Sequence, residues 1–245
     1  MEAPTIKQIL LITDGCSNKG EDPIKVAAAA RDKGITVNVI GVLDQDILGE
    51  QGEREIKAIA AAGGGVHQIV YTEQLSQTVQ MVTRQAMTQT IQGVVNVQLQ
   101  QIFGKEGSIE SLPPETRGEV VEIVDDLGET ATMKVLVLID ASASMYSKLS
   151  AVKESIFDLS ISLNSRTGDN SYSVFIFPGK RTDVENVLDW TGRLDSLTKI
   201  FAKLKTGGYT PTGPALSAAI TQFSPNPITN RDELFDEEAY FEEYI

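Results

Sequence analysis

Runs of apolar residues alternate along the chain with segments in which apolar positions recur every three or four residues. The runs are typical of buried strands, which we expect at residues 7–13, 35–42, 67–71, 133–140 and 171–177, with a weaker strand near 184–190. The helical spacing predicts helices at residues 23–33, 53–62, 147–165, 193–204 and 212–223. Strands that alternate with helices predict an α/β fold, a doubly wound and mostly parallel sheet with helices on both faces.

A long stretch with helical spacing separates the first three strands from the others. Its apolar residues predict a helix over residues 73–103, in which Gly93 is a candidate break. The ProPro pair at 113 and 114 starts another helix, with apolar residues on one face. We interpret residues 92–132 as a helical bridge that packs on the rest of the fold and not as an independent domain.

Composition narrows the class of protein. Among 245 residues, 41% are hydrophobic and no apolar run approaches the roughly 20 residues of a membrane helix, so we expect a cytoplasmic protein that does not enter the membrane. The net charge of −13 and the lack of a basic stripe argue against nucleic acid as a partner. The single cysteine, Cys16, excludes an internal disulfide and is more typical of an ordinary loop thiol than of a reactive one.

Oxygen-bearing side chains gather where the predicted strands end. Asp140, Ser142 and Ser144 follow one strand in the pattern DxSxS, and alternate spacing in an extended loop points them the same way. Asp14 ends another strand, and a glycine-rich loop at 206–214 adds the hydroxyl of Thr210. Ligands of doubly wound sheets lie at the carboxyl ends of strands where the strand order reverses. Hard oxygens, only two of them charged, suit Mg²⁺ or Mn²⁺, and such an ion accepts a further anionic ligand.

These motifs resemble those of the von Willebrand factor A family. Its metal-ion-dependent adhesion site combines DxSxS, a threonine from a later loop and an aspartate from a further strand end. The resemblance implies that Asp140, Ser142, Ser144 and Thr210 hold the ion directly or through water, and that Asp14 lies behind these ligands without contacting the ion. It implies the Rossmann-like fold of that family and a module that binds the carboxylate of a partner protein. Within the family the chain is similar to a small protein of endospore-forming bacilli, which implies a sporulation setting.

The order of the motifs departs from the family, in which DxSxS comes first and ThrAspGly last. The simplest interpretation is a circular permutation. Residues 5–91 then correspond to the second half of the domain, 92–132 to the bridge, 133–224 to the first half and 225–245 to an acidic tail. Alternatively, the halves of two chains complete each other in a swapped dimer, which gives the same site twice. Self-association through the acidic tail is a further hypothesis.

The chief enzymatic alternative is a Mg²⁺- or Mn²⁺-dependent hydrolase or phosphatase that uses the same site. We see no candidate base and no lysine among the metal loops, so we expect an interaction module and not an enzyme. The only histidine, His67, begins a different strand without a motif around it and is expected to be structural. The partner is therefore expected to be a protein that supplies an Asp or Glu.

Overall fold

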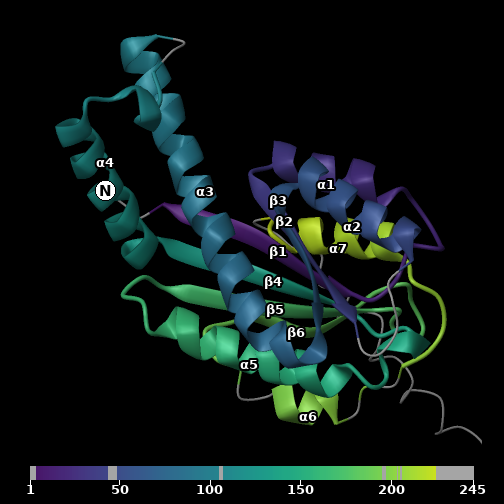
Figure 1. The fold of residues 1–245 in the computed structure, drawn as a ribbon. Coiled ribbons are helices and arrows are strands. Elements are labelled where there is room, and N and C mark those ends of the chain that lie inside the picture. The colour runs from purple at the N-terminus through teal and green to yellow at the C-terminus, as the bar shows by residue number, and fades with distance from the viewer. Residues whose placement is uncertain are drawn as a thin grey trace, which may run out of the picture.

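The computed structural model describes residues 4–43, 49–104, 107–194, 197–202, 204 and 206–224, and Figure 1 shows their arrangement. Six strands form one sheet in the order β3-β2-β1-β4-β5-β6. Their bounds are β1 Thr5–Thr13, β2 Ile35–Leu43, β3 Gly64–Tyr71, β4 Thr132–Asp140, β5 Asn170–Phe177 and β6 Glu185–Thr191. All neighbouring pairs are parallel except β5 and β6, which are antiparallel. The predicted doubly wound α/β fold is confirmed.

Two layers of helices cover the sheet, because the strands are apolar on both faces (Figure 1). One face packs against α3 (Leu75–Phe103) and α5 (Leu149–Asn164), and the other against α1 (Pro23–Asp32), α2 (Glu50–Ala62) and α7 (Thr212–Gln222). The remaining helices of the described residues are α4 (Pro114–Thr130), the short α6 (Leu197–Phe201) and three 3-10 turns. None of the described helices combines the length and the apolar character that a membrane span requires.

Residues 92–132, the expected bridge, comprise the second half of α3 and α4, whereas the first half of α3 packs on the sheet (Figure 1). The predicted break at Gly93 is wrong, since α3 runs through it as one helix of 29 residues. Glycine costs a helix only about 1 kcal/mol relative to alanine, and the buried first half of α3, including Val79 and Val82, anchors the helix in the core. The bridge returns the chain to the sheet, where Arg166 donates hydrogen bonds to the carbonyls of Gly128 and Ala131 at 2.7 Å each.

Candidate metal site

The site depends on the pairing of β1 with β4, which lie far apart in sequence but side by side in the sheet. Their register places Leu11 beside Leu138 and Ile12 beside Ile139, so Thr13 and Asp140 come next on the two strands. The Thr13 hydroxyl donates to Asp140 Oδ2 at 2.7 Å. Asp14 follows directly, so both predicted acids lie at the same edge of the sheet, at the carboxyl ends of parallel strands.

Asp140 is a fully buried carboxylate whose hydrogen-bond partners in the described part of the chain are neutral. Its side chain accepts from Thr13 and from the backbone N–H of Ser142, the latter at 2.8 Å to Oδ1. Burial raises the pKa of Asp140 from 3.8 to about 6, and the hydrogen bonds from Thr13 and Ser142 only partly offset this effect. An added cation would favour the charged form of this group.

The hydroxyls of the DxSxS loop connect Asp140 to Asp14. A 3-10 turn over Ala143–Met145 follows Ser142 and brings the two serines together, with 3.2 Å between Ser142 Oγ and Ser144 Oγ. Ser144 Oγ in turn donates to Asp14 Oδ1 at 2.8 Å. Ser142 is buried, whereas Ser144 is exposed, so the group opens to solvent on the side of Ser144.

The second carboxylate, Asp14, already has a cation. Lys148 Nζ lies 2.5 Å from Asp14 Oδ2, and the two side chains are only 9% and 2% exposed. The same ammonium is 3.3 Å from the backbone carbonyl of Ser144. The expectation that no lysine accompanies the metal loops is therefore wrong. Lys148 lies four residues beyond the motif, and a helical turn after Ser144 brings its ammonium back onto the site.

The loop that carries Thr210 is held against the site by backbone contacts. Gly207 N donates to the carbonyl of Ala141 at 3.0 Å, which joins this loop to the DxSxS segment. Thr210 N donates to Asn18 Oδ1 at 2.8 Å, and Asn18 N donates to the Thr210 carbonyl at 3.1 Å. Thr210 is buried between these contacts, in the loop that also leads into α7. Two residues on, the buried Thr212 hydroxyl has no hydrogen-bond partner among the described residues.

A surface cluster fixes the outer side of the same loop. Tyr209 OH donates to Asp183 Oδ1 at 2.9 Å, and Lys19 Nζ pairs with the same oxygen at 2.7 Å. The Lys19 ammonium also lies 3.9 Å from the centre of the Tyr209 ring. Three loops, those after β1, after β5 and before α7, are thereby joined at the rim of the site.

The donor set fits a hard divalent cation. Its side chains supply two carboxylates and several hydroxyls, and the described residues contain no group of three or more His, Cys, Asp or Glu that could hold a metal ion. A soft metal such as zinc prefers imidazole and thiolate, whereas magnesium and manganese accept oxygen ligands. Burial and the nearby Asp14 charge both raise the pKa of Asp140, so a cation beside this carboxylate would favour its charged form.

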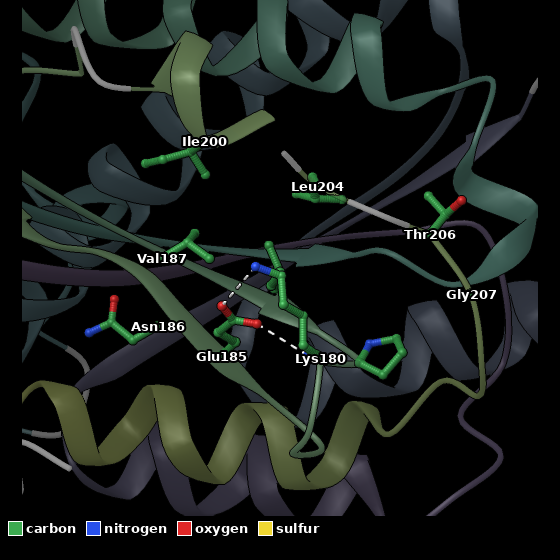
Figure 2. Close-up of a pocket in the computed structure, with 11 residues that line it drawn as sticks. Lys180, Glu185, Asn186, Val187, Ile200, Leu204, Thr206 and Gly207 are labelled. Carbon is green, nitrogen blue, oxygen red and sulfur yellow. Dashed lines mark hydrogen bonds and ion pairs between the residues drawn. The ribbon is translucent and has the colours of Figure 1, made fainter. Parts of the chain in front are cut away.

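A pocket of about 470 Å³ borders the site without forming part of it (Figure 2). Apolar side chains of Val187, Ile200 and Leu204 line one part, and Lys180 and Glu185 point toward each other across another, 3.9 Å apart. The pocket shares Gly207 with the loop that carries Thr210. Much of its lining is apolar or glycine, and its two charged side chains pair with each other. The oxygen cluster is therefore the better candidate for a functional site.

Two other candidates from the sequence lie outside the oxygen cluster. His67 is on β3, the edge strand, separated from β4 by β2 and β1. Cys16 is half-buried close behind Asp14, and burial raises the pKa of its thiol, which favours the unreactive protonated form. The acidic tail at 225–245 lies outside the described residues.

Comparison with known proteins places the chain in a family. The model of the von Willebrand factor type A domain matches residues 3–85. The chain is 58% identical over 239 residues to the uncharacterized protein YabS of Bacillus subtilis (strain 168), covering 98% of this chain and 97% of that protein. A crystal structure of an uncharacterized protein from Alicyclobacillus acidocaldarius subsp. acidocaldarius DSM 446 is similar with a TM-score of 0.83 and 42% identity, over 89% of this chain and 93% of that one. The chain therefore belongs to the von Willebrand factor type A domain family.

Proposed function

We propose that the chain is a protein-interaction module that binds Mg²⁺ or Mn²⁺ at a metal-ion-dependent adhesion site and, through it, a carboxylate of a partner protein. The observation that carries this proposal is the connected cluster of the buried Asp140 carboxylate, the Ser142 and Ser144 hydroxyls and the Asp14 carboxylate, which opens to solvent at Ser144. Family membership supports an interaction module over an enzyme. The partner is a protein that presents an Asp or Glu.

The residues have separate roles in this proposal. Asp140, Ser142, Ser144 and Thr210 hold the ion, and Asp14 orients the Ser144 hydroxyl through its hydrogen bond. Thr13 and the Ser142 N–H fix the Asp140 carboxylate, so one rotamer is already selected before binding. When bound, the ion supplies an open position for an oxygen of the partner. The exposed position of Ser144 marks the direction from which that oxygen arrives.

We also propose that the domain is circularly permuted, with halves at 5–91 and 133–224 joined by the bridge at 92–132. Two observations support this. The family model matches residues 3–85, whereas the DxSxS motif lies after β4, and the strands of the two segments meet only at the β1–β4 pair. The β1–β4 pairing shows that one chain can complete the site alone, and we propose a monomer. A monomer predicts a mass of 26.5 kDa in light scattering after size exclusion, and a stable dimer would contradict it.

One observation favours the hydrolytic alternative, namely the Lys148 ammonium inside the site, because such a group could stabilise a phosphate oxygen. Its Nζ is, however, paired with Asp14 and the Ser144 carbonyl. The only histidine, His67, lies on the far edge strand and is too remote to act as a base. We therefore keep hydrolysis as the second candidate, to be tested with phosphate monoesters in Mg²⁺ or Mn²⁺.

Thermal unfolding with and without the metal tests the proposed function. A ligand that binds only the folded state adds about 2.7 kcal/mol at a hundredfold excess over its dissociation constant. The wild type should melt higher in Mg²⁺ or Mn²⁺ than in chelator, and Asp140→Ala should lose this shift. Asp32→Asn, at the exposed end of α1, is the matched control and should keep it. An identical response of the wild type and Asp140→Ala would refute the site.

Phosphatase turnover separates the two functions. Sustained turnover of a phosphate monoester by the wild type, lost in Asp140→Ala, would replace the interaction module with the hydrolase. Metal-dependent stabilisation without turnover supports the module.

Sporulation stays the proposed setting, and unchanged spore yield after deletion of the gene in an endospore-forming host would contradict it.

A further inference from the structure

Lys148 places a positive charge inside the proposed metal site. Its ammonium lies 2.5 Å from Asp14 Oδ2 and 3.3 Å from the Ser144 carbonyl, with only 9% of the side chain exposed. The ammonium therefore contacts both the acid that orients Ser144 and the backbone of Ser144 itself. Among the described residues, Lys148 is the cation in the hydrogen bonds and ion pairs of Asp14, Ser144 and Asp140.

The position of Lys148 is unfavourable for the helix that it begins. Lys148 is the N-cap of α5, and its side chain makes no capping hydrogen bond. Helix N-terminal caps favour Ser, Thr, Asp or Asn, and the positive end of the helix dipole disfavours a cation. Helix stability alone thus does not explain a lysine at this position, whereas its contact with the buried Asp14 does.

Lys148 changes the net charge of the site, both before and after a divalent ion binds. Asp140 and Asp14 carry two negative charges, and Lys148 returns one, so the connected side chains carry −1 before a metal binds. A divalent ion changes this sum to +1, which one carboxylate of a partner neutralises. Without Lys148, the two carboxylates alone would neutralise the same ion, and the site would have no net positive charge to attract an anion.

We infer that Lys148 is a built-in cation that lowers the metal affinity of the site and thereby makes metal loading depend on a carboxylate ligand. This inference rests on the proposed function, because it concerns the same ion. The fixed charge of Lys148 acts in two directions. It stabilises the metal-free site by neutralising Asp14, and it repels the incoming divalent ion.

Lys148→Gln tests both effects of the lysine charge, on the stability of the metal-free protein and on metal affinity, with Mn²⁺ as the only added ligand. The amide is shorter by one bond but keeps an N–H donor toward Asp14 and removes the charge. We expect calorimetric Mn²⁺ affinity to rise about tenfold, as expected for the loss of a like charge at close range. In chelator the variant should melt lower than the wild type, because the buried Asp14 loses its counter-ion. The Mn²⁺-induced rise in melting temperature should consequently be larger than that of the wild type.

A merely structural lysine would give a different result, since its loss would lower stability without increasing Mn²⁺ affinity. Lys153→Gln, five residues further along α5 and partly exposed, is the control for charge on the same helix and should leave the affinity unchanged. If Lys148→Gln does not fold, Lys148→Gln with Asp14→Asn removes both charges of the pair and should fold in chelator. Its Mn²⁺ affinity should then exceed that of Asp14→Asn alone.

The outcomes separate this inference from the proposed function. If the wild type and Lys148→Gln both fold and bind Mn²⁺ with equal affinity, the inference about Lys148 is refuted. The proposed function is not affected by that result. Absence of Mn²⁺ binding in both refutes the two together. Binding by Lys148→Gln but not by the wild type at the same concentration supports the inference in its strongest form.

Discussion

The ends of β1 and β4 carry the same kind of side chain in opposite electrostatic settings. Asp140, the last residue of β4, is buried with hydrogen bonds from the Thr13 hydroxyl and the Ser142 N–H, and burial raises its pKa to about 6. Asp14, after β1, is equally hidden at its side chain but faces the ammonium of Lys148. Two adjacent acids at one sheet edge are therefore not equivalent. One still lacks a cation and can accept one from solution, whereas the other obtains its cation from the chain.

This difference predicts unequal effects on metal binding. Asp140→Asn should lower Mn²⁺ affinity at least about a hundredfold, because it removes the charged ligand that lacks a counter-ion. Asp14→Asn should lower it only about tenfold, because Asp14 acts through the Ser144 hydroxyl and its charge is already balanced. Titration calorimetry with Mn²⁺ measures both. An equal loss of Mn²⁺ affinity in the two variants would show that Asp140 and Asp14 contribute equally to metal binding.

Asp14→Asn and Asp140→Asn should change the stability of the metal-free protein in opposite directions. Asp14→Asn leaves the Lys148 ammonium buried without its partner and should destabilise the fold by about 3 kcal/mol. Asp140→Asn removes a buried charge and keeps hydrogen-bonding groups that face Thr13 and the Ser142 N–H, so it should stabilise the fold by about 1–2 kcal/mol at pH 7. Denaturant unfolding in chelator measures both changes.

The pH dependence of the same measurement identifies the cause. The pKa of Asp140 rises on folding from 3.8 to about 6, so the folded state binds the proton more tightly than the unfolded chain. The cost of the charged form is thus present above pH 6 and disappears as the pH falls below 4. The advantage of Asp140→Asn over the wild type should shrink across this window. An advantage that stays constant from pH 7 to pH 4 would contradict the assignment to burial of charge.

Much of the fold could be predicted from sequence, because its strands are apolar on both faces and its helices have clear starts. Pro23 begins α1 with Asp22 as its cap, and β1, β2, β4 and β5 agree with the predicted runs within two residues. Gly93 was misleading because a helix tolerates one exposed glycine when the turns before it are anchored in the core. The predicted helix at 193–204 is shorter than expected, with α6 covering only Leu197–Phe201.

The motif residues could also be predicted to meet, since parallel strands end at the same sheet edge. Lys148 and Thr13 could not be found in this way. Thr13 is part of an ordinary strand pattern, and only the β1–β4 register shows that it faces Asp140. The contact of Lys148 depends on the tight turn over Ala143–Met145, which directs the start of α5 toward Asp14. A lysine at a helix N-cap is the one local signal in the sequence, because that position disfavours it.

The smallest effect should come from Thr13, the last residue of β1, whose hydroxyl contacts the end of β4. Thr13 donates to Asp140 Oδ2 at 2.7 Å, and its hydroxyl also interacts with the Gly15 N–H at 3.3 Å, beside Asp14. Thr13→Val keeps the shape but removes these contacts, which should cost about 1 kcal/mol in chelator and lower Mn²⁺ affinity only a few-fold. Thr36→Val, on the neighbouring β2 and linked to Thr90 by one hydroxyl contact, is the control and should not change Mn²⁺ affinity. If Thr13→Val instead reproduced the loss seen for Asp140→Asn, the position of the Asp140 carboxylate, and not its lack of a cation, would govern metal binding.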